Sequence, residues 1–277
     1  MKRLLTLFLL SCFSSGYGQY YFNDLVSIQM GNEQYRLLRS QRIRQISATS
    51  YEADNTLTDG FQLEEDISLD GKKIQLRTAI ASGHRSVTDR FYEQGRIRRT
   101  QTYSNGISSK TVYTYTPNGL IQTIAITTTD TAMKTTVLEA HEWNYDNKGQ
   151  PVSMWLIKNK TDSTLIELKK DEKGLIIEEN WKKNNRIRET YYYYYDAANH
   201  LTDIVRYNAR LKKLIPDFQY EYDSNGKVTQ MIQISMGSAS YFIWKYQYNE
   251  NGLKSQESGY DKEKKLAGKI VYTYQKQ

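Results

Sequence analysis

The sequence predicts an all-β fold: tandem antiparallel β-hairpin repeats that form a long curled or rolled meander sheet, with one N-terminal helix. Two observations predict it. Aromatic residues make up 13% of the 277 residues, with 24 Tyr against 7 Phe, and tyrosine favours the pleated surface of half-buried strands. A pattern of aromatic, any residue, tyrosine, turn and glycine also recurs along the chain, as in Tyr220–Gly226. Such recurrence indicates a repeat architecture.

Residues 1–18 are predicted to be a secretory signal peptide. Basic residues precede an apolar run over 4–10 and a stretch of small residues that ends at Gly18, which is the order of a secretory leader. The run is shorter than the ~20 residues of a membrane-spanning helix. Cys12, the single cysteine, follows Leu9-Leu10-Ser11 and resembles a lipoprotein box, so a lipid anchor at Cys12 is the alternative to soluble secretion. We expect an exported protein in the periplasm, on the outer membrane surface or outside a Gram-negative bacterium.

Residues 19–66 are expected to hold the N-terminal helix and the first strands. A helix is predicted over 23–40, because Asn23 or Asp24 can cap it and four apolar residues share one face at helical spacing: Leu25, Ile28, Tyr35 and Leu38. Residues 41–46 fit a helix or a strand. Further on, alternation predicts a strand whose apolar face carries Phe61, Leu63, Ile67 and Leu69. Asp70-Gly71 then predicts a hairpin turn.

Residues 67–277 are predicted to form the hairpin repeat domain. From Gly119 to Gly252 the turn residue recurs at intervals of 25 to 30 residues. Between these turns, and after the last, lie second turn candidates such as Asn208-Ala209 and Gly237-Ser238. Each unit is therefore two strands of about ten residues joined by polar turns, which is typical of an antiparallel meander.

The repeated motif is interpreted as structural. Its first turn position can cap backbone amides, and its fourth adopts the left-handed conformation that closes a hairpin loop. One carboxylate per unit does not supply the six to eight oxygens that calcium prefers. The predicted turn residues are Asp146, Gly149, Asp171, Gly174, Asp196, Asn199, Asp223, Gly226, Asn249 and Gly252.

The repeat strands are expected to be apolar mainly on one face. Leu214, Phe218, Tyr220 and Tyr222 alternate with polar residues such as Asp217. A sheet with one apolar face must roll up, fold over or cover that face with the helix.

The tandem pattern resembles the YD repeats of RHS-type secreted bacterial proteins over roughly residues 90–277. The resemblance rests on Trp143/Tyr145/Asp146/Gly149, Tyr193/Tyr195/Asp196/Asn199, Tyr220/Tyr222/Asp223/Gly226 and Tyr246/Tyr248/Asn249/Gly252. It implies hairpins that wind into a long sheet, and here a stand-alone repeat module. Leu168 and Lys170 depart from the pattern before Gly174.

Catalytic chemistry is not expected. His84, His141 and His200 are isolated in the sequence without metal-ligand spacing, so neither a metal nor a cofactor is predicted. Glu178 and Glu179 are neighbours in a predicted strand and should point to opposite faces; we interpret them as a solvated strand edge. The net charge of +7 is spread along the chain, which argues against a nucleic-acid surface.

The candidate ligand-binding residues are aromatic side chains off the motif face: Trp155, Tyr192, Tyr194 and Tyr241. Flat rings with a polar tip suit sugars or peptides; the alternative is that a rolled sheet buries part of its second face. We expect a non-enzymatic cell-envelope module that binds a surface glycan or an envelope protein. The alternative is a carrier or periplasmic scaffold whose curled sheet holds lipid or peptide. A transmembrane barrel fits less well, since charged residues interrupt both faces of many strands.

Overall fold

The structure is a computed structural model that describes residues 19–208, 212–234 and 240–276. The predicted signal peptide, including Cys12, lies outside these residues. So do parts of two expected turns, at Ala209 and at Gly237-Ser238.

The predicted N-terminal helix is confirmed. A π-helical turn, η2 (Tyr21–Val26), continues into α1 (Ser27–Ser40). Tyr35 and Leu38 are buried, as the helical spacing predicts. The predicted cap is wrong, because Asp24 lies inside the π-helical turn and is buried there instead of binding the first amides. In the described part of the chain, neither helical segment has the length and apolarity needed to cross a membrane.

The rest of the described chain is antiparallel β-structure, as predicted. The strands are β1 (Ile43–Glu52), β2 (Gln62–Ile67), β3 (Lys73–Ala79), β4 (Arg85–Glu93), β5 (Arg96–Ser104), β6 (Ile107–Tyr115), β7 (Ile121–Asp130), β8 (Thr135–Tyr145), β9 (Pro151–Lys158), β10 (Asp162–Lys170), β11 (Ile176–Lys183), β12 (Arg186–Tyr195), β13 (Leu201–Asn208), β14 (Lys213–Tyr222), β15 (Val228–Ile234), β16 (Tyr241–Tyr248), β17 (Lys254–Tyr260) and β18 (Leu266–Lys276). Of the ambiguous residues 41–46, residues 41 and 42 therefore form a turn and residues 43–46 begin β1.

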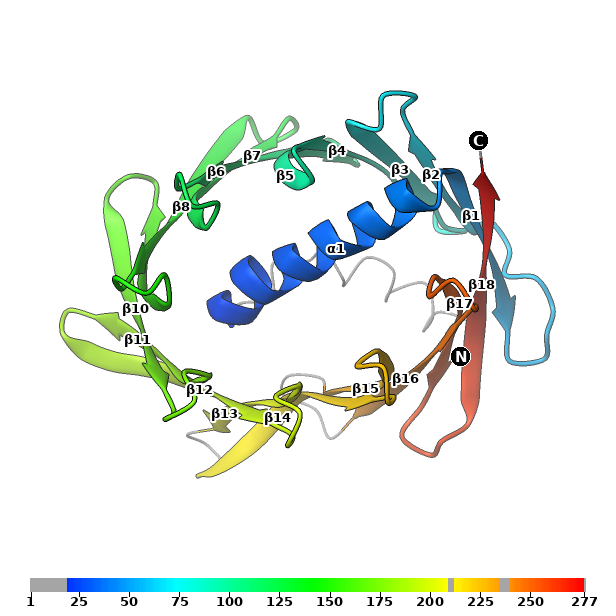
Figure 1. Cartoon of the computed structure of the whole chain (residues 1–277). Coiled ribbons are helices and arrows are strands. Elements are labelled where there is room, and N and C mark those ends of the chain that lie inside the picture. Colours follow the sequence, from blue (N-terminus) through cyan, green and yellow to red (C-terminus); the bar gives the residue numbers. More distant parts are fainter. Residues whose placement is uncertain (1–18, 209–211, 235–239, 277) are drawn as a thin grey trace. The chain divides into compact units, whose positions relative to one another are not determined.

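Strand pairing follows the chain order, and Figure 1 labels the strands. The expected curled or rolled meander is confirmed in part, and the sheet is not an open one, because β1 pairs with β18 as well as with β2. The first and last strands therefore satisfy each other's backbone groups, which would be unpaired at the edges of an open sheet.

The chain forms two compact units. One contains Gln19–Ile46, Leu63–Thr190 and the end of the chain from Tyr274, and the other contains Ser47–Gln62 and Tyr191–Thr273. We call them the helix-bearing unit and the C-terminal unit. The expected domain boundary after residue 66 stays a prediction.

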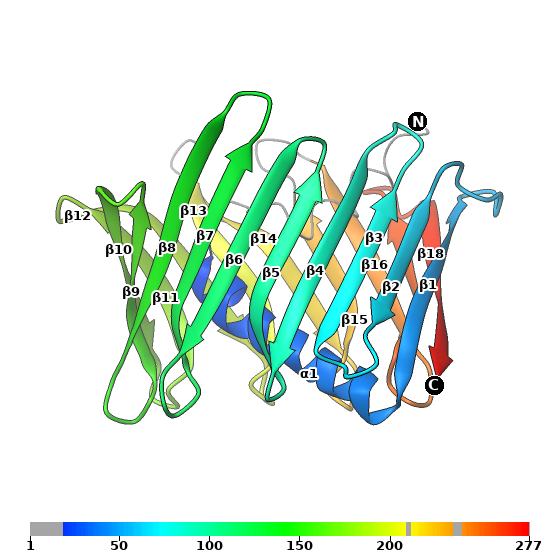
Figure 2. The same cartoon turned by 90° about the horizontal axis from the view of Figure 1, so that it is seen from above.

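The core of the helix-bearing unit lies between the helical segments and one face of the sheet. Figure 2 shows α1 lying along the sheet of β4 to β7, and α1 contacts β5. Leu25 and Ile28 pack against a buried cluster that includes Ile124, Trp143 and Met154. In the C-terminal unit, a separate core centres on Trp244 and Ile270.

The motif turns contain the hydrogen bonds that capping requires. Asp146 Oδ1 accepts the backbone N–H groups of Lys148 and Gln150, and the N–H of Gly149 donates to the carbonyl of Asp146. The loops that begin at Asp171, Asp196 and Asp223 repeat this pattern. Position four has a positive φ throughout, including +66° at Asn199 and +73° at Gly226. Each turn is therefore stabilised by its own residues.

Two leucines that were expected on the apolar face of a strand are exposed instead, for local reasons. Leu69 is 82% exposed because β2 ends at Ile67, before the alternation would bury it. Leu214 is 46% exposed because the register with β13 shifts between Phe218 and Pro216. The additional residue, Asp217, reverses the faces of the residues before it.

Candidate functional site

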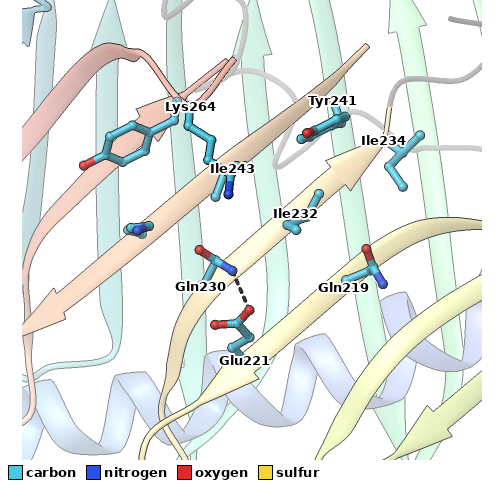
Figure 3. Close-up of a pocket in the computed structure, with 10 residues that line it drawn as sticks. Gln219, Glu221, Gln230, Ile232, Ile234, Tyr241, Ile243 and Lys264 are labelled. Atoms are coloured by element: carbon cyan, nitrogen blue, oxygen red, sulfur yellow. Dashed lines mark hydrogen bonds between the residues drawn. The ribbon is translucent and has the colours of Figure 1, made fainter. Parts of the chain in front are cut away.

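A groove of about 510 Å³ lies on one face of the C-terminal unit, over β14 to β17 (Figure 3). Its floor is aliphatic, and it is formed by Ile232, Ile234 and Ile243. The rings of Tyr241 and Tyr260 line it as well. The groove therefore offers an apolar surface on the face of the sheet that was expected to be polar.

Strand register explains this apolar floor. Gln219 lies opposite Ile232, Ile232 opposite Ile243, and Ile243 opposite Tyr260. Residues directly opposite each other project to the same face, so these four form a row across four strands. Tyr220 follows Gln219 by one residue, and Trp244 follows Ile243 by one residue. Both therefore project to the other face. The motif aromatics and the groove thus occupy opposite faces of the same strands.

Polar groups surround the floor. Gln230 Nε2 donates to Glu221 Oε1 at 2.6 Å (Figure 3). Gln219 Nε2 donates to Asp203 Oδ1 at 2.8 Å. Lys245 and Lys264 supply positive charge, and Lys245 Nζ lies 5.5 Å from the centroid of the Tyr260 ring. An apolar floor with amide and ammonium groups at its margin suits an amphipathic ligand.

The sequence-predicted ligand residues are only partly brought together. Tyr241 lines the groove, with its hydroxyl donating to the carbonyl of Lys262 at 3.2 Å. Tyr194, 46% exposed, lies opposite Asp203, which in turn lies opposite Gln219 at the groove. Tyr192 is half-buried on the same face as Tyr194. The three therefore lie on the groove side of the C-terminal unit.

Trp155 belongs to the helix-bearing unit. It is 40% exposed and lies opposite Leu165 and Glu142. It does not line the groove.

The helix-bearing unit contains a buried polar cluster that sequence reasoning missed. His141 Nδ1 lies 2.7 Å from Asp24 Oδ2, and His141 Nε2 lies 2.9 Å from Glu139 Oε1. Trp143 Nε1 also donates to Asp24. Asp24 and His141 are 117 positions apart, so only folding brings them together. The interpretation of His141 as an isolated residue is therefore wrong.

The two carboxylates keep His141 charged although it is buried. Burial alone lowers the pKa of His141, but the charges and hydrogen bonds of Asp24 and Glu139 outweigh it and raise the pKa to about 9. The hydrogen bond from His141 lowers the pKa of Glu139 in return. At neutral pH the imidazolium therefore donates from both ring nitrogens.

Glu179 holds the first turn of the helix in place. Its carboxylate accepts the backbone N–H groups of Tyr20 and Tyr21 at 3.0 and 2.8 Å, and Trp181 Nε1 at 2.7 Å. A carboxylate at a helix N-terminus is favourable because it faces unpaired amides and the positive end of the dipole. Glu179 is fully buried, so its interpretation as part of a solvated edge is wrong. Glu178 projects the other way and pairs with Lys169.

Both clusters are best explained as anchors of the helical segment. Every acidic group in them has a hydrogen-bond donor or a cation beside it, as buried charges require. Within residues 19–208, 212–234 and 240–276, no group of three or more His, Cys, Asp or Glu side chains could hold a metal ion. The groove of the C-terminal unit remains the better candidate for ligand binding.

Neither a protein-family model nor a curated protein matches the sequence. Among solved structures, the chain is similar to a porin-like protein from Bacteroides uniformis, with 9% identity, 85% of this chain and 97% of that chain covered, and a TM-score of 0.41. It is also similar to a porin-like protein from Bacteroides vulgatus, with 10% identity, coverage of 84% and 98%, and a TM-score of 0.30. A third similarity is to the Photorhabdus luminescens Tc holotoxin pore, with 12% identity, 78% of this chain and 16% of that chain covered, and a TM-score of 0.31.

Proposed function

We propose that this protein is a non-catalytic carrier module of the cell envelope, and that the groove over β14 to β17 holds the apolar part of a lipid or peptide. The aliphatic floor of Ile232, Ile234 and Ile243 carries the proposal. Ile243 is only 6% exposed, so the floor is continuous with packed structure. The envelope location rests on the predicted export signal at residues 1–18.

Apolar contact would supply most of the affinity. Burying a hydrocarbon chain gains about 0.8 kcal/mol for each methylene group removed from water. Lys245 and Lys264 then give the ligand an orientation, because an anionic head group would lie toward the ammonium groups. The lining residues include one carboxylate, two amides and two ammonium groups, which is a set suited to binding.

A glycan or protein partner is the second candidate. The exposed ring of Tyr194, beside Asp203 and Gln219, favours it, since flat rings next to amide and carboxylate groups suit sugars. Within the groove itself, the rings of Tyr241 and Tyr260 could also stack on a sugar, but the floor of the groove is aliphatic, and this favours the carrier.

The test is binding of a fluorescent fatty acid to the full chain, together with native mass spectrometry of protein purified from its own envelope. Ile234→Gln should weaken fatty-acid binding about tenfold, equal to about 1.4 kcal/mol of lost apolar contact. Ile187→Gln is the matched control, because Ile187 is 55% exposed on β12 and outside the groove. Equal weakening in both variants, or no binding by the unaltered protein, would refute the carrier. A glycan-array signal that Tyr194→Ala abolishes would favour the second candidate.

A further inference from the structure

A second concave surface lies where α1 ends and β1 begins, in the helix-bearing unit. It has a volume of about 610 Å³ and is lined by Arg39, Arg42, Ile43, Arg44 and Leu69. Three of the five lining side chains are guanidinium groups, and none is acidic. We call it the arginine pocket.

The protein holds two of these arginines in place. Arg44 donates from Nη1 to the carbonyl of Ser68 at 2.6 Å and from Nη2 to that of Leu69 at 3.0 Å. The guanidinium of Arg39 lies against Gly71, where a Cβ atom would come within 1.9 Å of Arg39 Cζ. Gly71 has a φ of +69°, so glycine at this position both permits the turn and leaves room for the arginine.

The charges of Arg39 and Arg42 are neutralised only in part by neighbouring residues. Among the described residues, the side chains of Arg39 and Arg42 form no hydrogen bond and no ion pair within 4 Å. The acid beside Leu69 is Asp70, whose carboxylate accepts the Ser68 hydroxyl and the Lys72 amide. The pKa of Asp70 is lowered first by the hydrogen bond from the Lys72 amide and also by the charge of Arg39. The pocket therefore keeps a positive charge that an anionic ligand could neutralise.

The end of α1 explains only part of this arrangement. A cation in the last turn of a helix is stabilised by the helix dipole, and this accounts for Arg39. Arg42 lies beyond the helix, exposed, with a φ of +57°, and the dipole does not require it. Leu69, on the rim, is 82% exposed, so an apolar contact adjoins the guanidinium groups.

We propose that the arginine pocket binds a phosphoryl group, carried either by a phospholipid or by a soluble phosphate compound. A guanidinium presents parallel N–H donors that match two phosphate oxygens. Arg39 and Arg42 are the binding groups, and Arg44, held on its two carbonyls, adds charge. In the lipid case Leu69 would enter the interface beside the phosphate.

The experiment compares three probes on the full chain: inorganic phosphate by calorimetry, and vesicles with and without phosphatidylglycerol by co-sedimentation. Arg42→Gln should weaken phosphate binding at least tenfold and leave thermal unfolding unchanged. Arg186→Gln is the matched control, because Arg186 is an exposed arginine on β12 and outside the pocket. It should have no effect.

Leu69→Gln separates the two sources. If the ligand is a lipid, this variant loses binding to phosphatidylglycerol vesicles and keeps its affinity for inorganic phosphate. If the ligand is soluble, neither changes and Arg42→Gln still loses phosphate. The proposal is overturned if the protein binds no phosphate, or if Arg186→Gln weakens binding as much as Arg42→Gln.

Discussion

Replacement of His141 by glutamine should remove a pH dependence from the stability of the helix-bearing unit. In the folded protein the pKa of His141 is raised from 6.5 to about 9. A group whose pKa is higher in the folded state stabilises fully below its unfolded pKa, and that contribution is lost as pH rises through the folded pKa. The difference between the two pKa values of His141 corresponds to about 3 kcal/mol of folding free energy. His141 should therefore contribute about that much at pH 6 and almost nothing at pH 10.

Two of the ionisable groups around His141 keep one charge state across this pH window. The pKa of Glu139 is lowered, first by its hydrogen bond from His141, so it stays ionised from pH 6 to 10. Burial raises the pKa of Tyr20, whose ring lies 4.9 Å from that of His141, so its hydroxyl stays neutral. Two other ionisable groups lie close to His141: Asp24 contacts it directly, and Lys158 pairs with Glu139.

Amide hydrogen exchange of Tyr20 and Tyr21 is the assay, because both amides donate to Glu179 beside the cluster. Protection in the unaltered protein should exceed that in His141→Gln at pH 6, and the two should converge by pH 10. His84→Gln is the control, since the hydrogen bonds of His84 within the described part of the chain go to Ser104 and Asn105, at the end of a hairpin. Parallel pH profiles for the unaltered protein and His141→Gln would refute the reasoning.

Two further changes test the packing of the turns and of the helix. Gly226→Ala should destabilise its turn more than Gly174→Ala. Both positions have a positive φ, at which a side chain costs about 1 kcal/mol. Of the two, Gly226 is the one where the new Cβ would meet another residue, at 2.9 Å from Nε2 of His200. Equal changes in amide exchange at the two turns would contradict this. Tyr35→Phe should lower the free energy of unfolding by about 1 kcal/mol, because the buried Tyr35 hydroxyl donates to the carbonyl of Gly71 at 2.8 Å. Urea unfolding measures this loss of stability. Tyr103→Phe is the control and should leave the stability unchanged, because Tyr103 is 57% exposed. A neutral Tyr35→Phe would show that the hydrogen bond adds no net stability.

Local features were predictable from the sequence because neighbouring residues decide them. The capping side chain at Asp146 and the glycine at Gly149 complete their turn within four residues, so the hairpins follow from short-range chemistry. The helix followed from the spacing of Tyr35 and Leu38. Of the candidate site, the sequence indicated Tyr241, since alternation alone places it off the motif face.

Only the tertiary structure decided the long-range features. Asp24 meets His141 across 117 positions, and the pairing of β1 with β18 joins opposite ends of the sheet. The strand register that gathers three isoleucines into the groove depends on β14 to β17 pairing in one alignment. Each of these contacts becomes favourable only after the intervening chain has been ordered. Short-range residue patterns carry no information on which distant contact then offsets the entropy cost of that ordering.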